Sequence, residues 1–171
     1  MAINFPSSPT LGQTYQYIDR EWTWSGTYWY VSSVGSGGGS SGTGLGSRST
    51  VSVTTPSIAP GVQSNGLSVI GFKSYALYKV STTAAAWVRI YTSASAQVAD
   101  GQRLLGTDPI PGNGVVAEVV TTGATSQLIS PATIGFNDDN IIGTAIYVTV
   151  SNQSASTAAI TVTLTINQLE G

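Results

Sequence analysis

The C-terminal part of the chain alternates between apolar and polar side chains with a period of two. In "TAIYVTVSN" (144–152) and "AAITVTLTINQLE" (158–170), Ile, Val and Leu occupy every second position and Thr fills most of the others. This spacing is typical of β-strands with one buried face, because successive side chains point to opposite sides of a strand. We therefore predict two strands here. The turn-forming "NQSAST" (152–157) between them predicts that they pair as a hairpin.

Residues 47–171 read as β-structure almost throughout. Further strands are expected at 50–54, 67–71, 74–82, 86–92, 115–121 and 126–130. The clusters "TPSIAPG", "DPIPGNG" and "SPATIGFNDDN" punctuate them as turns, and "SAQVADGQRLLG" (95–106) is the one candidate for a helical turn. Many short strands with this punctuation predict an all-β fold. An antiparallel β-sandwich is our first expectation, with a jelly roll as the alternative.

A Gly/Ser tract, "GSGGGSSGTGLG" (35–46), separates this domain from the N-terminal residues 1–34. Such a tract has few side chains to pack, so it predicts a flexible linker. In the N-terminal segment, "EWTWSGTYWYV" predicts two strands joined by a Ser-Gly turn, and "QTYQYID" can add a third. A β-module of this size is marginal by itself.

The N-terminal module is rich in aromatic rings. They can form its own small core, a plug that docks on a partner, or a platform on which sugar rings stack. Core packing and docking are the favoured interpretations. The residues expected to form this anchor are Phe5, Pro6, Tyr15, Trp22, Trp24, Tyr28 and Trp29.

Charged residues make up 8% of the chain, against about 25% in an average soluble protein. The net charge of −2 provides no basic field for nucleic acid or an anionic membrane. Neither a membrane-length apolar run nor a basic segment after Met1 is present. We therefore expect no nucleic-acid partner, no membrane insertion and synthesis in the cytoplasm.

Catalytic chemistry is hard to assemble from this composition. The chain contains neither His nor Cys, which excludes Ser-His-Asp triads, thiol proteases, disulfides and His/Cys zinc sites. Glu118 in "VVAEVV" is the one candidate acid, and it is expected to face solvent or to pair with an arginine. Asp138 and Asp139 in "FNDDN" can bind Ca²⁺ or simply shape a turn. We predict no enzyme, no cofactor and no metal site.

Trp87, Arg89 and Tyr91 lie at alternate positions of "WVRIY" and so share one face of a strand. Arginine over an aromatic ring predicts a cation–π pair. The three side chains are also the types that anchor protein interfaces. The simplest interpretation remains a core tryptophan beside a surface arginine.

Two stretches resemble known phage proteins. "FPSSPTLGQTY…WTWSGTYWYV" resembles a short N-terminal repeat of cyanobacterial-phage structural proteins, with a Phe-Pro-x-x-Pro opening, a Gly-x-x-Tyr step and a Trp-x-Trp-x-Gly-x-x-Trp hairpin. The larger domain is similar to a β domain of phage virion and tail-fibre-like proteins. "AAAWVRIYT", "TDPIPGNGV" and "AEVVTTGAT" carry that similarity.

The resemblance implies a structural component of a tailed-phage virion, oligomeric and most simply a homotrimer. A short fibre or appendage anchored by its N-terminal module is the leading expectation, and a capsid decoration protein is the alternative. Its partners would be capsid, neck or tail proteins. A different class, a carbohydrate-binding module, would require Trp22, Trp24 and Trp29 to face a host glycan.

Overall fold

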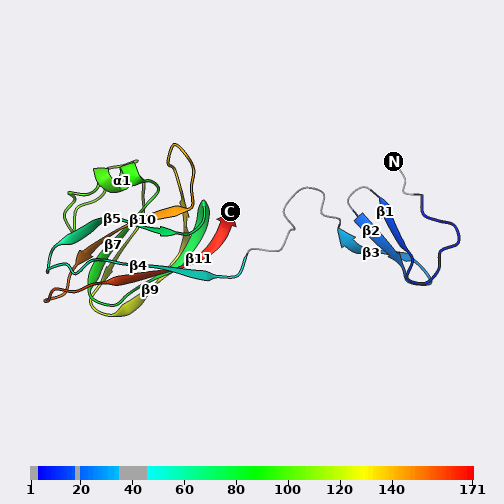
Figure 1. Ribbon diagram of the computed structural model, residues 1–171, viewed down its shortest axis with the longest axis horizontal. Helices are drawn as coiled ribbons and strands as arrows, with labels where there is room; N and C mark the ends of the chain where they lie inside the picture. Colours follow the sequence, from blue (N-terminus) through cyan, green and yellow to red (C-terminus); the bar gives the residue numbers. More distant parts are fainter. Residues whose placement is uncertain (1–3, 18–19, 35–45) are drawn as a thin grey trace. The chain divides into compact units, whose positions relative to one another are not determined.

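The chain divides into two compact units, Met1–Gly44 and Leu45–Gly171. The computed structural model describes residues 4–17, 20–34 and 46–171 (Figure 1). Apart from Gly46, the linker expected at 35–46 lies outside the described residues. Three antiparallel sheets and a single short helix make up the secondary structure of the described part, which confirms the all-β prediction.

The first unit is a three-stranded antiparallel sheet with the order β1-β2-β3. Its strands are β1 (Thr14–Tyr17), β2 (Arg20–Trp24) and β3 (Trp29–Val34). The predicted hairpin and the third strand from "QTYQYID" are both confirmed. Register places Tyr15 opposite Trp22 and Trp24 opposite Trp29, so aromatic residues face each other across both strand pairs.

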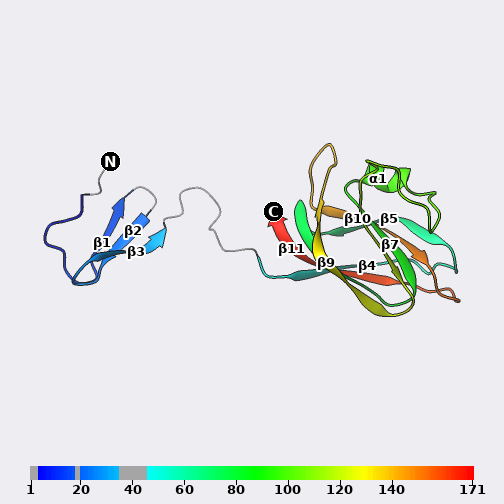
Figure 2. The same cartoon turned by 180° about the vertical axis from the view of Figure 1, so that it is seen from behind.

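The second unit consists of two four-stranded antiparallel sheets (Figure 2). The first sheet contains, in order, β5 (Gln63–Ile70), β10 (Ala145–Asn152), β7 (Ala86–Tyr91) and β8 (Val115–Thr121). The second contains, in order, β4 (Ser49–Thr54), β11 (Thr161–Glu170), β6 (Ser74–Thr82) and β9 (Thr125–Phe136).

The chain changes sheet at every connection between consecutive strands of this unit except β7 to β8. This is the double-sheet, eight-stranded arrangement of a jelly roll, so the alternative named from the sequence is the observed architecture. Its core lies between the sheets and is built from the apolar members of the alternating strands. The buried core side chains include Leu77, Val80, Val88, Ile90, Ile146, Val148, Val150, Val162, Leu164 and Ile166.

The predicted hairpin between the last two strands is wrong. β10 and β11 lie in different sheets, and the segment between them crosses from one sheet to the other. Asn152 shapes this crossing: its side-chain amide donates to the carbonyl oxygens of Ile58 at 2.8 Å and Ser156 at 2.9 Å. Alternation shows that each strand has one buried face, but it does not show which strands pair. β10 and β11 bury their apolar faces in the same core from opposite sheets.

Two element boundaries also differ from expectation. β9 continues to Phe136, so the first half of "SPATIGFNDDN" is strand and not turn, and it pairs with β6 beyond an irregularity in register. β5 begins at Gln63, earlier than the predicted residue 67, and β11 begins at Thr161, later than residue 158.

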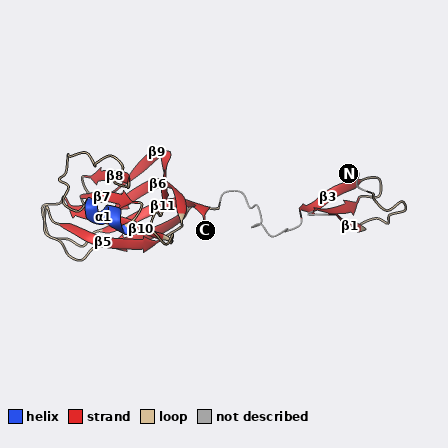
Figure 3. Ribbon diagram, turned by 90° about the horizontal axis from the view of Figure 1, so that it is seen from above, coloured by secondary structure: helices blue, strands red, loops and turns tan. Residues whose placement is uncertain are grey.

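Residues 92–114, called the excursion below, connect β7 to β8 across the outer face of the first sheet. The excursion contains α1 (Ala94–Ala99), which is shorter than the predicted helical segment, and the Oγ of Ser93 caps it by accepting from Ala96 N at 3.1 Å. Figure 3 shows α1 over β5, β10 and β7. Gln97 attaches the helix to the sheet by donating to the carbonyl oxygens of Leu67 and Val148.

Candidate functional site

The aromatic residues of the first unit form a cluster on one face of its sheet. Phe5 lies ahead of β1, and its ring stacks on Trp29 with centroids 5.1 Å apart and planes 11° apart. The same ring meets Tyr15 and Trp22 edge-on, at 5.5 and 5.2 Å. Offset and edge-on contacts at these distances are favourable beyond the area they bury. Phe5 therefore closes the aromatic face of the sheet.

Trp24 completes the cluster through Trp29, with centroids 5.5 Å apart. All three tryptophans are half-buried. The indole N–H of Trp22 is buried, with no hydrogen-bond acceptor among the described residues. Five of the seven anchor residues predicted from the sequence thus meet in one cluster that serves as the core of the module, and Pro6 follows Phe5 beside it.

Tyr28 lies outside this cluster. Together with Tyr30 it occupies the opposite face of β3 and its turn, because both alternate with Trp29 along the chain. Their side chains are 63% and 44% exposed, and the rings meet edge-on at 6.4 Å. Ser25 fixes the turn, since its Oγ accepts from Tyr28 N at 3.0 Å. The module therefore presents two tyrosines outward, Tyr28 from a hydrogen-bonded turn and Tyr30 from β3.

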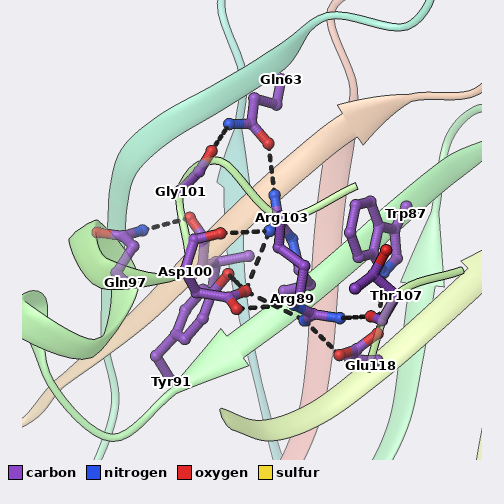
Figure 4. Close-up of polar contacts among 11 residues, drawn as sticks. Gln63, Trp87, Arg89, Tyr91, Gln97, Asp100, Gly101, Arg103, Thr107 and Glu118 are labelled. Carbon is purple, nitrogen blue, oxygen red and sulfur yellow. Dashed lines mark hydrogen bonds and ion pairs between the residues drawn. The ribbon is translucent and has the colours of Figure 1, made fainter. Parts of the chain in front are cut away.

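The second unit contains a buried charged network beneath the excursion (Figure 4). Arg89, on β7, is completely buried and places Nη1 3.0 Å from Asp100 Oδ2 and 2.9 Å from the Asp100 carbonyl oxygen. Its Nη2 donates to the side-chain oxygen of Gln63. Of the 6 basic and 8 acidic residues in the chain, two of each meet in this network.

Asp100 is the centre of the network. Burial alone would raise the pKa of its carboxyl, but hydrogen bonds from Arg103, Tyr91 and Arg89, together with the Arg103 charge, outweigh it and lower the pKa. Arg103 Nε lies 2.7 Å from Oδ1, and the Tyr91 hydroxyl lies 2.8 Å from Oδ2. Burial and this hydrogen bond raise the pKa of Tyr91. Asp100 is therefore held as a carboxylate.

Glu118 joins the network through Arg103 Nη2, and it accepts from Trp87 Nε1 at 3.3 Å. Pairing with an arginine was one of the two outcomes expected for this residue, and the structure confirms it. Arg103 also donates to the carbonyl oxygen of Thr107 at 2.7 Å. The Arg103 guanidinium thus links two parts of the excursion to each other and links the excursion to β8.

The cation–π prediction is confirmed, because the guanidinium carbon of Arg89 lies 4.0 Å from the Trp87 ring centroid. The expectation of a surface arginine is wrong. Trp87, Arg89 and Tyr91 are 2%, 0% and 1% exposed, and they hold the excursion against the sheet. A lone arginine among apolar residues was the sequence signal for this burial, but nothing in the spacing indicated Asp100 as its partner.

A cleft of about 510 Å³ lies beside the network. It opens where β5 begins and β10 ends. Its lining includes Trp87, Arg103 and the exposed apolar residues Val62, Leu104 and Leu105. Since the neighbouring Arg103 and Arg89 charges are balanced by Asp100 and Glu118, the wall carries no net charge from the network.

Asp138 and Asp139 have different roles. The carboxylate of Asp139 accepts from Tyr147 Oη at 2.6 Å, from Asn137 Nδ2 at 3.1 Å and from Ala94 N at 3.1 Å. The hydrogen bond from Tyr147 is the main reason that its pKa is lowered. Asp138 is exposed. Among the described residues, no three acidic side chains lie close enough to hold a metal ion.

No family model, curated protein or solved structure matches this chain. Within the described ranges, no helix is both long and apolar enough to span a bilayer.

Proposed function

We propose that this protein is a structural component of a tailed-phage virion, a short fibre or appendage protein with a small N-terminal anchor and a displayed jelly roll. The resemblance of both stretches to phage structural proteins motivates the proposal. Division into two compact units supports it, because each unit can then serve a separate contact. The jelly roll is compatible with a virion role but does not imply one, since this fold hosts many functions.

The observation that carries the anchor proposal is the outward pair Tyr28 and Tyr30. The module uses Phe5 and the tryptophans to hold itself together, which leaves the two tyrosines as its prominent exposed rings. Tyrosine is enriched at interface hot spots, and it loses little conformational entropy on binding. The hydrogen-bonded turn and the start of β3 present the two rings in advance of binding. We therefore place the docking contact on the tyrosine face and not on the tryptophan face.

The second unit is the displayed part in this proposal. It self-associates, most simply as a homotrimer, and contacts neighbouring virion proteins. A capsid decoration protein is the alternative within the same class, differing only in whether the anchor binds capsid or neck and tail. In neither case is an enzymatic activity proposed.

A carbohydrate-binding module has less support. Sugar rings stack on exposed and aligned aromatic faces. The planes of Trp24 and Trp29 are inclined by 53°, and the face of Trp29 is covered by Phe5. Tyr28 and Tyr30 are inclined by 64°, so they do not form a flat platform either.

The test adds gold-labelled full-length protein to purified capsids, necks and tails of cyanobacterial tailed phages and images the particles by electron microscopy. Binding to neck or tail supports the fibre, and binding to capsid supports the decoration protein. Replacing Tyr28 and Tyr30 by Ser should reduce binding at least tenfold. A matched control is Phe136→Ser, which removes a ring of similar exposure (47%) from the second unit. The anchor proposal fails if no particle binds, or if the double variant binds like the unchanged protein.

A further inference from the structure

The loop between β9 and β10, residues 137–144, carries two of the chain's exposed isoleucines. It protrudes from the sandwich in Figures 1 and 2, where it is drawn in gold. Ile141 is 88% exposed and Ile142 is 59% exposed. Ile70, which is 80% exposed, lies beside the base of the loop, because the next residue, Gly71, donates its N–H to the Thr144 carbonyl oxygen at 2.7 Å. We call these three isoleucines the knob.

The base of the loop is held in place by hydrogen bonds. The amide of Asn137 donates to the Ala145 carbonyl oxygen at 3.0 Å and accepts from Gly143 N at 3.2 Å. Asp139 is fixed by Tyr147 at 2.6 Å. Asn137 and Asp139 at the base are thus used internally, while the isoleucines are left to solvent. Large apolar side chains exposed at one end of a sheet are candidates for an interaction surface.

The cleft described above is the complementary feature. Its exposed apolar side chains are Val62, Leu104 and Leu105, with exposures of 48%, 75% and 49%. One polar side chain of the lining is already engaged: Gln63 accepts from Arg89 and donates to the Gly101 carbonyl oxygen. Gln102, Ser151 and Gln153 also line the cleft, so an apolar group that enters would pack on the three apolar side chains beside these polar ones.

The knob and the cleft lie at opposite ends of the same two strands. β5 begins at Gln63 beside the cleft and ends at Ile70 in the knob, and β10 runs in the opposite direction between the same two regions. Eight residues of strand span roughly 25 Å. A chain therefore cannot place its own knob in its own cleft, although a second copy can supply one.

We propose that the knob of one copy inserts into the cleft of the next, giving a head-to-tail contact between copies of this chain. The proposal rests on the self-association included in the proposed function and assigns it a surface. A head-to-tail contact closes into a ring, a trimer included, where the rotation between copies allows. Otherwise it propagates as a filament.

Charge does not oppose this contact. The exposed Asp138 at the base of the loop forms no ion pair among the described residues. On the cleft side, Arg103 is one of the lining residues, and the network around it is neutral overall. The net charge of −2 per chain is also too small to keep copies apart.

The area involved indicates the strength of the contact. Full burial of a Val, Leu or Ile side chain removes roughly 60–120 Å² of apolar surface. The six partly exposed side chains together offer on the order of 400 Å², below the roughly 1,000 Å² expected of a stable specific interface, so the contact is weak and transient between free copies. Anchoring several copies side by side would raise their effective concentration and make such a contact sufficient.

The test is sedimentation velocity of the purified full chain up to roughly 1 mM, a range chosen for a weak contact with a dissociation constant of roughly 0.1–1 mM. The unchanged protein should associate with increasing concentration. Ile141→Asp combined with Ile142→Asp removes the knob, and Leu104→Asp combined with Leu105→Asp removes the cleft. Each double variant should sediment as a monomer. The matched control Leu128→Asp changes a side chain that is 70% exposed on β9 and should associate like the unchanged protein.

Mixing the two double variants distinguishes a head-to-tail contact from a symmetric one. The knob-deficient copy retains a cleft and the cleft-deficient copy retains a knob, so an equimolar mixture should form a dimer and nothing larger. Circular dichroism melting checks that every variant is folded. The proposal is overturned by a monomeric unchanged protein, by association of either double variant alone, or by a mixture that stays monomeric. None of these results bears on the binding of the anchor to phage particles, which is measured separately.

Discussion

Arg89 and Asp100 form an ion pair that is almost completely removed from solvent. The guanidinium Nη1 and the carboxylate Oδ2 are 3.0 Å apart, and the two side chains are 0% and 2% exposed. Arg89 belongs to β7, whereas Asp100 follows α1 in the excursion. The excursion is thus held to the sheet largely by charge and hydrogen bonds, which leaves apolar side chains such as Leu104 on its outer side.

Asp100→Asn should destabilise the second unit strongly. The substitution keeps the size of the side chain but removes the negative charge that balances Arg89 and Arg103. Leaving a buried charge without its partner costs about 3–5 kcal/mol. We expect a loss of about 3 kcal/mol in the free energy of unfolding, measured by urea denaturation. The control is Asp108→Asn, an exposed aspartate in the same excursion, which should change stability by less than about 0.5 kcal/mol. Equal effects of the two substitutions would contradict the role of the network.

Stability should also fall in acid, and Asp100 should account for part of that fall. Its folded-state pKa is lowered, so the carboxylate stabilises the folded state above the unfolded-state pKa of about 3.9. This contribution is lost as the pH falls from the unfolded-state pKa through the folded-state pKa, because the unfolded chain binds a proton in this range that the folded protein does not. Urea midpoints between pH 7 and 2 should therefore decline.

The Asp100→Asn variant should show a shallower decline over the same pH range. The pKa of Asp139 is also lowered, and Asp139 still contributes to the pH dependence of stability in this variant, so that dependence should not vanish. An unchanged slope in Asp100→Asn would show that the carboxylate does not titrate with unfolding.

Alternation in the sequence predicted which side chains face inward, but not which strands pair. β10 and β11 each show a clear period of two, yet they pack from opposite sheets. The pairing depends on long-range closure of the sandwich, which a local pattern does not contain. The partner of Arg89 could not be predicted from a local pattern either. Arg89 lies among apolar neighbours in the sequence, but its burial depends on Asp100, which the excursion places next to β7.

The positions of the N-terminal aromatic rings could be predicted from the sequence only in part. Their number predicted a small core or a docking surface, and the structure contains both an inner cluster and an outer pair of rings. Alternation around Trp29 already separates Tyr28 and Tyr30 from it. The contribution of Phe5 could not be read from spacing, because it comes from a segment without regular structure ahead of β1.

Phe5→Ala should unfold the first unit while leaving the second unchanged. Phe5 contacts Tyr15, Trp22 and Trp29 and is half-buried, so its truncation should cost less than that of a fully buried phenylalanine, which is about 3–5 kcal/mol. A module this small has little stability to lose. Tryptophan fluorescence should shift to the red, since three of the 4 tryptophans lie in this unit. The control Tyr28→Ala removes an exposed ring and should leave the spectrum in place. A blue-shifted, native-like spectrum in Phe5→Ala would mean that the cluster of Tyr15 and the three tryptophans stays folded without the Phe5 ring.

Gly135→Ala tests the packing of β9 against the core. A Cβ at this position would collide with the ring of Tyr75, which is 1% exposed. Overpacking of this kind costs about 1–3 kcal/mol. Gly123→Ala is the matched control, because a Cβ there meets nothing within 4 Å. We expect the urea midpoint of Gly135→Ala to fall while that of Gly123→Ala stays level or rises slightly, since alanine restricts the unfolded chain. A Gly135→Ala variant as stable as the Gly123→Ala control would show that β9 does not lie against Tyr75 as described.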